Sequence, residues 1–196
     1  MWWAGVVGAC VVVATIIATL SLLQSRTSEP TTVDTSVSGA AGPIDSPSTA
    51  NPNGPPVGNR VGDVAPPFSL PSLAGETRSL SDYRGRIVIL DFWASWCVPC
   101  RLSMPSLEAM ARHLGDDVVL LGVSLDRTET EARSYVGSKG YTDLVALYGS
   151  LSEARAVASD YGVLGIPRTF VIDREGIVRF AGHPSLLSRG LVESLL

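Results

Sequence analysis

Apolar and polar positions follow two different periods along residues 61–196. Short continuous apolar runs, typical of buried strands, occur at residues 87–92, 118–124 and 144–147. Longer segments of mixed apolar and polar positions, which favour helices, occur at residues 99–114, 128–139, 151–161 and 186–195. Hairpins are predicted for residues 68–70 with 76–80 and for residues 169–173 with 177–181. Strands and helices in this order predict one α/β domain.

The opening segment has a different pattern. Residues 2–23 contain no charged side chain, and a helix of this length crosses the ~30 Å hydrocarbon core of a bilayer. We therefore expect residues 1–23 to form a transmembrane anchor. A cleaved signal peptide is the main alternative, but no basic segment precedes the apolar run and no small-residue cleavage site follows it.

Residues 24–60 are rich in serine, threonine, proline, glycine and asparagine and have few long apolar side chains. Such a segment cannot build a hydrophobic core, so it predicts a disordered linker. As a flexible chain it has an r.m.s. span of about 35 Å. The domain at residues 61–196 would then meet membrane-bound partners at a raised effective concentration.

The most specific chemical signal is the pair Cys97 and Cys100, placed between the strand at residues 87–92 and the helix at residues 99–114. Residues three apart on a helix have Cβ atoms ~5–6 Å apart, so the two sulfurs can form and break a disulfide. Cys97 stands at the helix start, where free N–H groups and the helix dipole stabilise a thiolate. Its pKa should therefore lie below the ordinary value of about 8.5. Attack by Cys97 on a disulfide, followed by resolution by a more buried Cys100, is the predicted chemistry.

Two other readings of the pair are less favoured. A zinc site needs four ligands, and Cys10, His113 and His183 are not at ligand-like spacing from the pair. A purely structural disulfide across so short a loop would restrain little of the unfolded chain and so stabilise little. We interpret His113 as a solvated helix-end residue and His183 as a loop residue. No metal is expected, and no cofactor other than the redox-active cysteine pair.

The composition bears on one class of partner, nucleic acid. The 196-residue chain has a formal net charge of −4, Lys139 is its single lysine, and there is no basic cluster. Nucleic acid is therefore not an expected partner.

Residues 91–100, Asp-Phe-Trp-Ala-Ser-Trp-Cys-Val-Pro-Cys, resemble the active site of the thioredoxin superfamily. Together with residues 61–70, 80–85 and 165–173 they resemble its membrane-anchored bacterial branch, the TlpA and ResA type. The resemblance covers essentially the whole of residues 61–196. It implies a thioredoxin-like α/β fold with an N-terminal β-hairpin extension and an inserted αβ element.

The resemblance also implies roles for residues outside the pair. Pro167 matches a proline that is cis in the superfamily and faces the cysteines, and the backbone of Ile166 before it would hydrogen-bond an extended substrate. An ordinary trans turn proline is the alternative. Trp93 and Trp96 match aromatic residues that pack and shape the surface around the nucleophile, and Pro105 matches a proline that kinks the following helix.

Asp91 matches the thioredoxin acid that handles the Cys100 proton, and burial on its strand should raise its pKa. ResA-type reductases carry a glutamate three residues after the second cysteine, where this chain has Ser103. We therefore expect Asp91 alone to serve as the proton relay.

Three further residues are expected to modulate the site. Val98 and Pro99 lie between the cysteines, and the identity of these two residues alone does not determine the redox potential. Arg168 stands where the family usually has threonine or glutamate. A cation there, if it lies beside the Cys97 thiolate, would favour the reduced state and raise the potential.

By this resemblance the protein is expected to be a single-pass cell-membrane protein with an extracytoplasmic thiol-disulfide oxidoreductase domain. Its expected task is to reduce the cysteine pairs of apocytochrome c for haem attachment, with electrons from a membrane thiol donor of the CcdA or DsbD type. A disulfide-forming oxidase of exported proteins is the first alternative. A thiol peroxidase is disfavoured because Ala94 replaces a hydroxyl residue three positions before the cysteine. A copper or haem-delivery chaperone with this fold is the non-enzymatic alternative, although His183 is a poor ligand candidate.

Overall fold

The computed structural model describes residues 54–196. The predicted anchor and all but the last residues of the predicted linker lie outside this range. None of the helices within residues 54–196 combines the length and the apolar character that crossing a membrane requires.

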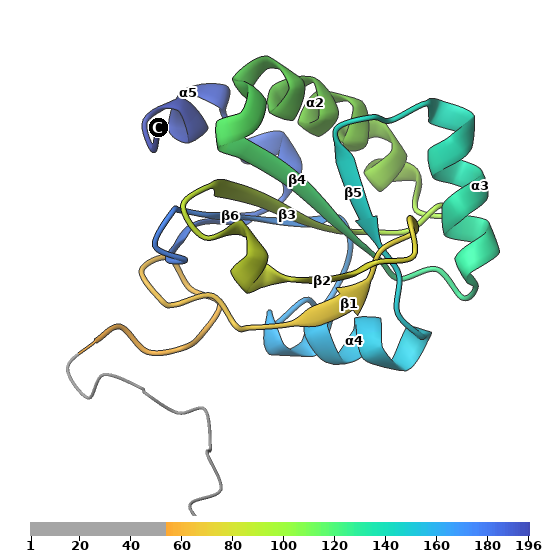
Figure 1. Ribbon diagram of the computed structural model, residues 1–196, viewed down its shortest axis with the longest axis horizontal. Helices are drawn as coiled ribbons and strands as arrows, with labels where there is room; N and C mark the ends of the chain where they lie inside the picture. Colours follow the sequence, from red (N-terminus) through yellow and green to blue (C-terminus); the bar gives the residue numbers. More distant parts are fainter. Residues whose placement is uncertain (1–53) are drawn as a thin grey trace, which may run out of the picture. The chain divides into compact units, whose positions relative to one another are not determined.

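A five-stranded sheet forms the centre of the domain, in the order β5-β4-β3-β6-β7 (Figure 1). Its strands are β3 (Ile87–Trp93), β4 (Val118–Ser124), β5 (Leu144–Leu147), β6 (Arg168–Ile172) and β7 (Val178–Gly182). β3, β4 and β5 run parallel, whereas β6 and β7 are antiparallel to their neighbours. A separate hairpin of β1 (Ser69–Pro71) and β2 (Thr77–Ser79) precedes the sheet and leads into the 3-10 turn η1 (Leu80–Tyr83). This arrangement confirms the predicted thioredoxin-like α/β fold.

Helices cover both faces of the sheet. They are α2 (Val98–Leu114), α3 (Glu129–Lys139), α4 (Leu151–Asp160) and α5 (Arg189–Glu193). Buried side chains of α2, α3 and α5 share one hydrophobic cluster, which defines the α2 face of the sheet. The cluster on the opposite face, the α4 face, contains side chains of α4 and of the hairpin. Figure 1 shows this separation, with α2 and α5 on one side of the strands and α4 and β1 on the other.

The central strand β3 is buried at all seven residues because it is covered on both faces. Side chains of a strand point alternately to its two faces. Ile87, Ile89 and Trp93 accordingly pack in the cluster of the α2 face, and Val88, Leu90 and Phe92 in that of the α4 face. Asp91 falls by the same alternation on the α2 face, the face that also holds the cysteine pair.

The folded segment begins before the predicted boundary at residue 61. The Gly58 N–H donates to the Val64 carbonyl at 2.9 Å, and the Val64 N–H donates to the Pro56 carbonyl at 2.8 Å. The backbone of these residues is therefore tied to the domain rather than belonging to the linker. The Tyr161 hydroxyl also donates to the Pro66 carbonyl at 2.8 Å and so fixes this segment to the end of α4.

The C-terminal helix is shorter than predicted. In place of one helix over residues 186–195, the chain forms the 3-10 turn η3 (Pro184–Leu186) and then the short α5. The reason is a new helix start at Ser188, whose hydroxyl accepts a hydrogen bond from the Leu191 N–H. The prediction of a single helix there was wrong.

Gly122 on β4 leaves room for the indole of Trp93. A Cβ atom at Gly122 would lie 2.8 Å from Trp93 Nε1 and 2.8 Å from a methyl carbon of Leu144. Both neighbours are part of the packed core, so neither can move away freely.

Replacing Gly122 by alanine should therefore lower the free energy of unfolding by roughly 1–3 kcal/mol, the usual cost of overpacking a core. Gly137, on an exposed turn of α3, is the matched control because its Cβ would meet nothing within 4 Å. Gly137→Ala should raise the free energy of unfolding by up to about 1 kcal/mol through helix propensity. Urea denaturation measures both variants, and equal effects of the two would contradict this packing.

Candidate functional site

Cys97 and Cys100 form a disulfide at the first turn of α2. Cys97 is the N-cap residue, and its sulfur accepts a hydrogen bond from the Cys100 N–H with an N–S distance of 3.2 Å. Pro99, at the second helical position, has no N–H to offer. The first turn of α2 also contains no acidic residue that would compete for its free N–H groups. The predicted placement of a sulfur at a helix N-terminus is confirmed.

The two sulfurs differ in access. Cys97 retains 5% exposure, whereas Cys100, in the first turn of α2, is fully buried, as predicted. The residues around Cys97 are exposed and apolar: Trp96 and Val98 are each 60% exposed. An apolar surface of this kind around a reactive group is typical of a contact site for a partner molecule.

Asp91 is fully buried and has a single hydrogen-bond partner among the described residues. The Thr169 hydroxyl, which is opposite Asp91 in the β3–β6 ladder, donates to its Oδ1 at 2.6 Å. Burial raises the pKa of Asp91 to about 7, and the hydrogen bond from Thr169 lowers it by a smaller amount. The raised pKa agrees with the expectation from sequence. Asp91 is thus a carboxyl group that exchanges a proton near neutral pH, on the same face of the sheet as Cys100.

The peptide bond between Ile166 and Pro167 is cis, as the resemblance implied. Pro167 is buried, and the half-buried Ile166 packs against the clusters of both faces. The proline directly precedes β6, so β6 brings this loop to the same end of β3 from which the cysteine loop departs.

Arg168 does not point toward the cysteine pair. It alternates with Thr169 along β6 and therefore belongs to the α4 face, where its guanidinium lies 5.5 Å from the centre of the Phe170 ring. The suggested effect of Arg168 on Cys97 thus has no direct contact to support it.

A second buried carboxylate, Asp126, holds the loop before the nucleophile. It accepts hydrogen bonds from the Ser95 N–H at 3.0 Å, the Ser95 hydroxyl at 2.7 Å and the Ser124 hydroxyl at 2.8 Å. Ser95 lies two residues before Cys97, so these bonds fix the loop between β3 and α2 to the end of β4. Sequence reasoning missed this contact because Ser95 and Asp126 are 31 residues apart and match no motif.

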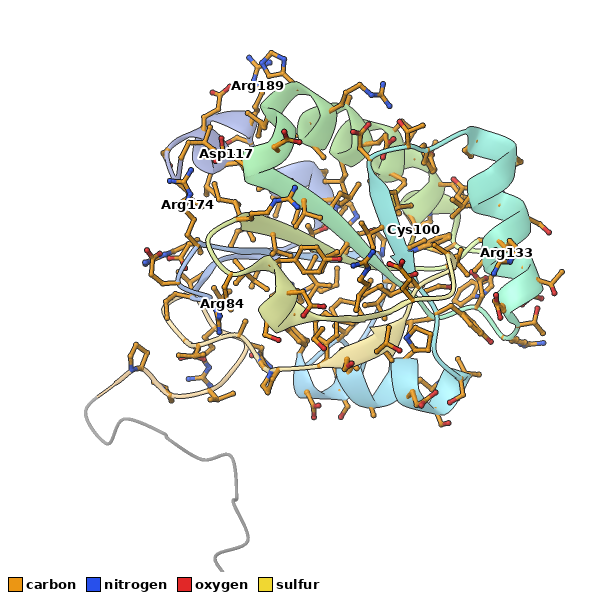
Figure 2. The ribbon with its side chains drawn as sticks, viewed as in Figure 1. Arg84, Cys100, Asp117, Arg133, Arg174 and Arg189 are labelled. Atoms are coloured by element: carbon orange, nitrogen blue, oxygen red, sulfur yellow. A yellow bond between two sulfur atoms is a disulfide. The ribbon has the colours of Figure 1, made fainter. Side chains whose placement is uncertain are left out.

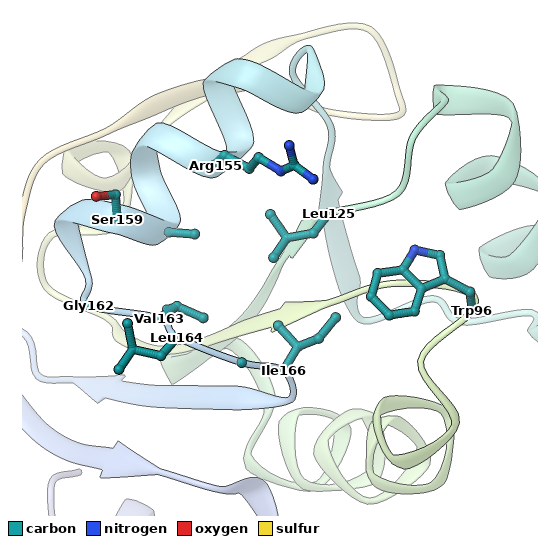
Figure 3. Close-up of a pocket in the computed structure, with 10 residues that line it drawn as sticks. Trp96, Leu125, Arg155, Ser159, Gly162, Val163, Leu164 and Ile166 are labelled. Atoms are coloured by element: carbon teal, nitrogen blue, oxygen red, sulfur yellow. The ribbon is translucent and has the colours of Figure 1, made fainter.

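A cavity of about 390 Å³ opens beside Trp96. Its walls come from the loop after β4, from α4 and from the loop before the cis proline: Leu125, Arg155, Ala158, Ser159, Gly162, Val163, Leu164, Gly165 and Ile166 (Figure 3). Trp96 and Ile166 were predicted to contact substrate, and the structure brings them together at this cavity. The contributions of α4 could not be predicted, because they depend on tertiary packing.

The remaining predicted positions have structural roles. Ser103 donates its hydroxyl to the Cys100 carbonyl at 3.1 Å and so supplies no acid to the site. Pro105 lies inside α2. His183 is the N-cap of η3, where its Nδ1 accepts from the Ser185 N–H, rather than a plain loop residue. His113 is exposed in the last turn of α2. Within residues 54–196 no three potential metal-ligating side chains gather at one place.

Comparisons with known proteins agree on the class of this site. The sequence pattern of the AhpC/TSA family matches residues 61–181, the range that contains every predicted site residue. The thiol-disulfide oxidoreductase ResA from Geobacillus thermodenitrificans is 33% identical over 120 residues, which are 61% of this chain and 67% of the relative. The thiol:disulfide interchange protein HelX from Rhodobacter capsulatus is 35% identical over 128 residues, which are 62% of this chain and 68% of the relative.

A solved structure shows the same fold. The thioredoxin domain of a thiol-disulfide oxidoreductase from Bacteroides vulgatus is 28% identical, with a TM-score of 0.59, and the match covers 69% of this chain and 94% of that domain.

Proposed function

The chain belongs to the AhpC/TSA family, as a thiol-disulfide oxidoreductase of the TlpA and ResA type, and we propose that it reduces the cysteine pairs of apocytochrome c before haem attachment. The observation that carries the proposal is the Cys97 sulfur at the N-terminus of α2 beside an exposed apolar surface. Similarity to ResA and HelX supports thiol-disulfide exchange as the chemistry of the site. We further propose an extracytoplasmic domain on a single-pass anchor, which receives electrons from a membrane thiol donor of the CcdA or DsbD type.

The proposed reduction takes place in two exchange steps. The Cys97 thiolate attacks one sulfur of the client disulfide, so a Cys97–client disulfide forms and the second client sulfur leaves as a thiolate. Cys100 then loses its proton to Asp91 and attacks Cys97, which closes the protein disulfide and releases the first client sulfur. The product is the Cys97–Cys100 disulfide seen in the structure, which the electron donor must reduce before another cycle.

The family also includes thiol peroxidases, but the residue three positions before Cys97 is the fully buried Ala94. An alanine has no hydroxyl to bind a peroxide oxygen there. We therefore favour disulfide exchange over peroxide reduction. The disulfide-forming oxidase and the copper or haem-delivery chaperone remain alternatives, and the redox potential and the metal content of the purified protein distinguish them.

The direction of electron flow is tested by the reduction potential of the Cys97–Cys100 pair. We expect a value below about −200 mV, because a reductant must lie nearer thioredoxin at about −270 mV than the oxidant DsbA at about −120 mV. Equilibration with glutathione buffers measures it, with Cys97→Ser as the redox-inactive control. A potential near −120 mV would contradict the reductive proposal and favour a disulfide-forming oxidase.

The proton relay is tested by replacing Asp91 with asparagine, which keeps the size of the side chain but cannot take up a proton. The carboxylate form of Asp91 is the base, so the rate of client reduction should rise as pH increases through about 7. Asp91→Asn should lower the rate at neutral pH by about a hundredfold and leave only the pH dependence that comes from ionisation of Cys97. Glu108→Gln is the matched control, because it neutralises a different buried carboxyl, which lies on α2. An unchanged rate and pH profile for Asp91→Asn would exclude the relay.

A further inference from the structure

The cavity beside Trp96 joins two chemical surfaces. Its walls are mostly apolar and include the indole of Trp96 together with Leu125, Val163, Leu164 and Ile166. Trp96 directly precedes Cys97, and Ile166 directly precedes the cis proline, so two of the lining residues (Figure 3) are chain neighbours of the redox site. A molecule bound in this cavity would therefore lie next to the chain segments that carry Cys97 and Pro167.

One cationic side chain, that of Arg155, lines the cavity. Arg155 is exposed on α4, and Figure 3 shows its guanidinium extending over the cavity toward Leu125. Within residues 54–196 it makes no ion pair, unlike Arg112, Arg133 and Arg189, whose guanidinium groups each contact a carboxylate. Leu125, toward which the guanidinium extends, is followed in the chain by Asp126. The carboxylate of Asp126 already accepts hydrogen bonds from Ser95 and Ser124. The Arg155 guanidinium is thus available to a carboxylate of a bound molecule.

We propose that Arg155 and the apolar walls of this cavity select the client: they bind a client segment in which a large apolar side chain lies next to an acidic residue, beside the reactive disulfide. The inference rests on the proposed exchange between Cys97 and protein clients and specifies which clients exchange fastest. A peptide segment is the favoured occupant because it supplies both features. Glutathione also carries carboxylates but has no apolar side chain to fill the walls.

The size of the charge effect follows from the exposure of Arg155. A solvent-exposed ion pair contributes little, so an acidic neighbour should speed exchange by about threefold and a basic one should slow it by about threefold. A glutamate peptide and a lysine peptide should then differ about tenfold in rate.

The test uses the reduced full chain in detergent and short peptides with one cysteine linked to nitrothiobenzoate. Cys97 attacks the peptide sulfur, a Cys97–peptide disulfide forms, and the bond to nitrothiobenzoate breaks with release of its coloured thiolate. The peptides carry Leu-Glu, Leu-Lys, Ser-Glu or Ser-Lys beside the cysteine, on either side of it. The readout is the ratio of rates between peptides within one protein variant, so a general loss of activity does not affect it.

Two variants separate the contribution of the charged side chain from that of the apolar walls. Arg155→Glu should invert the preference from the glutamate to the lysine peptides, and Leu164→Asn, at a fully exposed position, should reduce the preference for leucine over serine. Arg189→Glu is the matched control: it makes the same charge change on α5, which Figure 2 shows at the other end of the domain from Cys100. It should leave every ratio unchanged.

Three outcomes would overturn the inference. The first is equal rates for glutamate and lysine peptides, and the second is a preference that Arg155→Glu does not alter. The third is an Arg155 dependence as strong for glutathione disulfide as for the Leu-Glu peptide, which would make a small thiol the occupant. Hydroxyethyl disulfide, which is neutral and too small to fill the cavity, tests the exchange itself. If the unmodified protein failed to reduce it, the proposed function would fail together with the inference, whereas lost selectivity alone would remove only the latter.

Discussion

The redox site depends on one contact, the hydrogen bond from the Cys100 N–H to the Cys97 sulfur. Serine, threonine or aspartate usually accepts this bond at the start of a helix, and here a sulfur that can carry a negative charge takes that position. Pro99 leaves the Cys100 N–H as the donor aimed at the sulfur. The remainder of α2 keeps this donor in place, because Met104, Leu107 and Ala111 are buried against the sheet.

The sheet positions the second group of the proposed chemistry, the carboxyl of Asp91. β3 carries Asp91 into the core on the same face as the cysteines, and burial there makes its carboxyl group weakly acidic. The same strand ends in the loop that Asp126 fixes through hydrogen bonds from Ser95. Among the described residues the Asp91 side chain has one hydrogen-bond donor, whereas the Asp126 side chain has several.

Much of the fold could be predicted from the sequence. The apolar runs of β3, β4 and β5 were predicted almost to the residue, since buried parallel strands are apolar on both faces. The short-range geometry at Cys97 was also predictable, because a helix start depends on a few neighbouring residues. The break between η3 and α5 was missed because Ser188, a good N-cap residue, lies within a run that was read as one helix.

The rest of the site depends on tertiary packing. Ser95 and Asp126, or Trp96 and Arg155, are brought together by the order of the strands and not by spacing along the chain. Arg168 is a partial exception, because strand alternation could have shown that its side chain lies on the other face of the sheet from that of Thr169.

The central claim is that the Cys97 thiol is ionised near neutral pH because of its place at the helix start. The direct measurement is the rate of alkylation of the reduced protein against pH, with Cys100→Ser to isolate Cys97 and Cys97→Ser to subtract the reaction of Cys10. The account predicts a Cys97 pKa well below about 8.5. A thiol that reacts slowly and titrates at the ordinary value would contradict it.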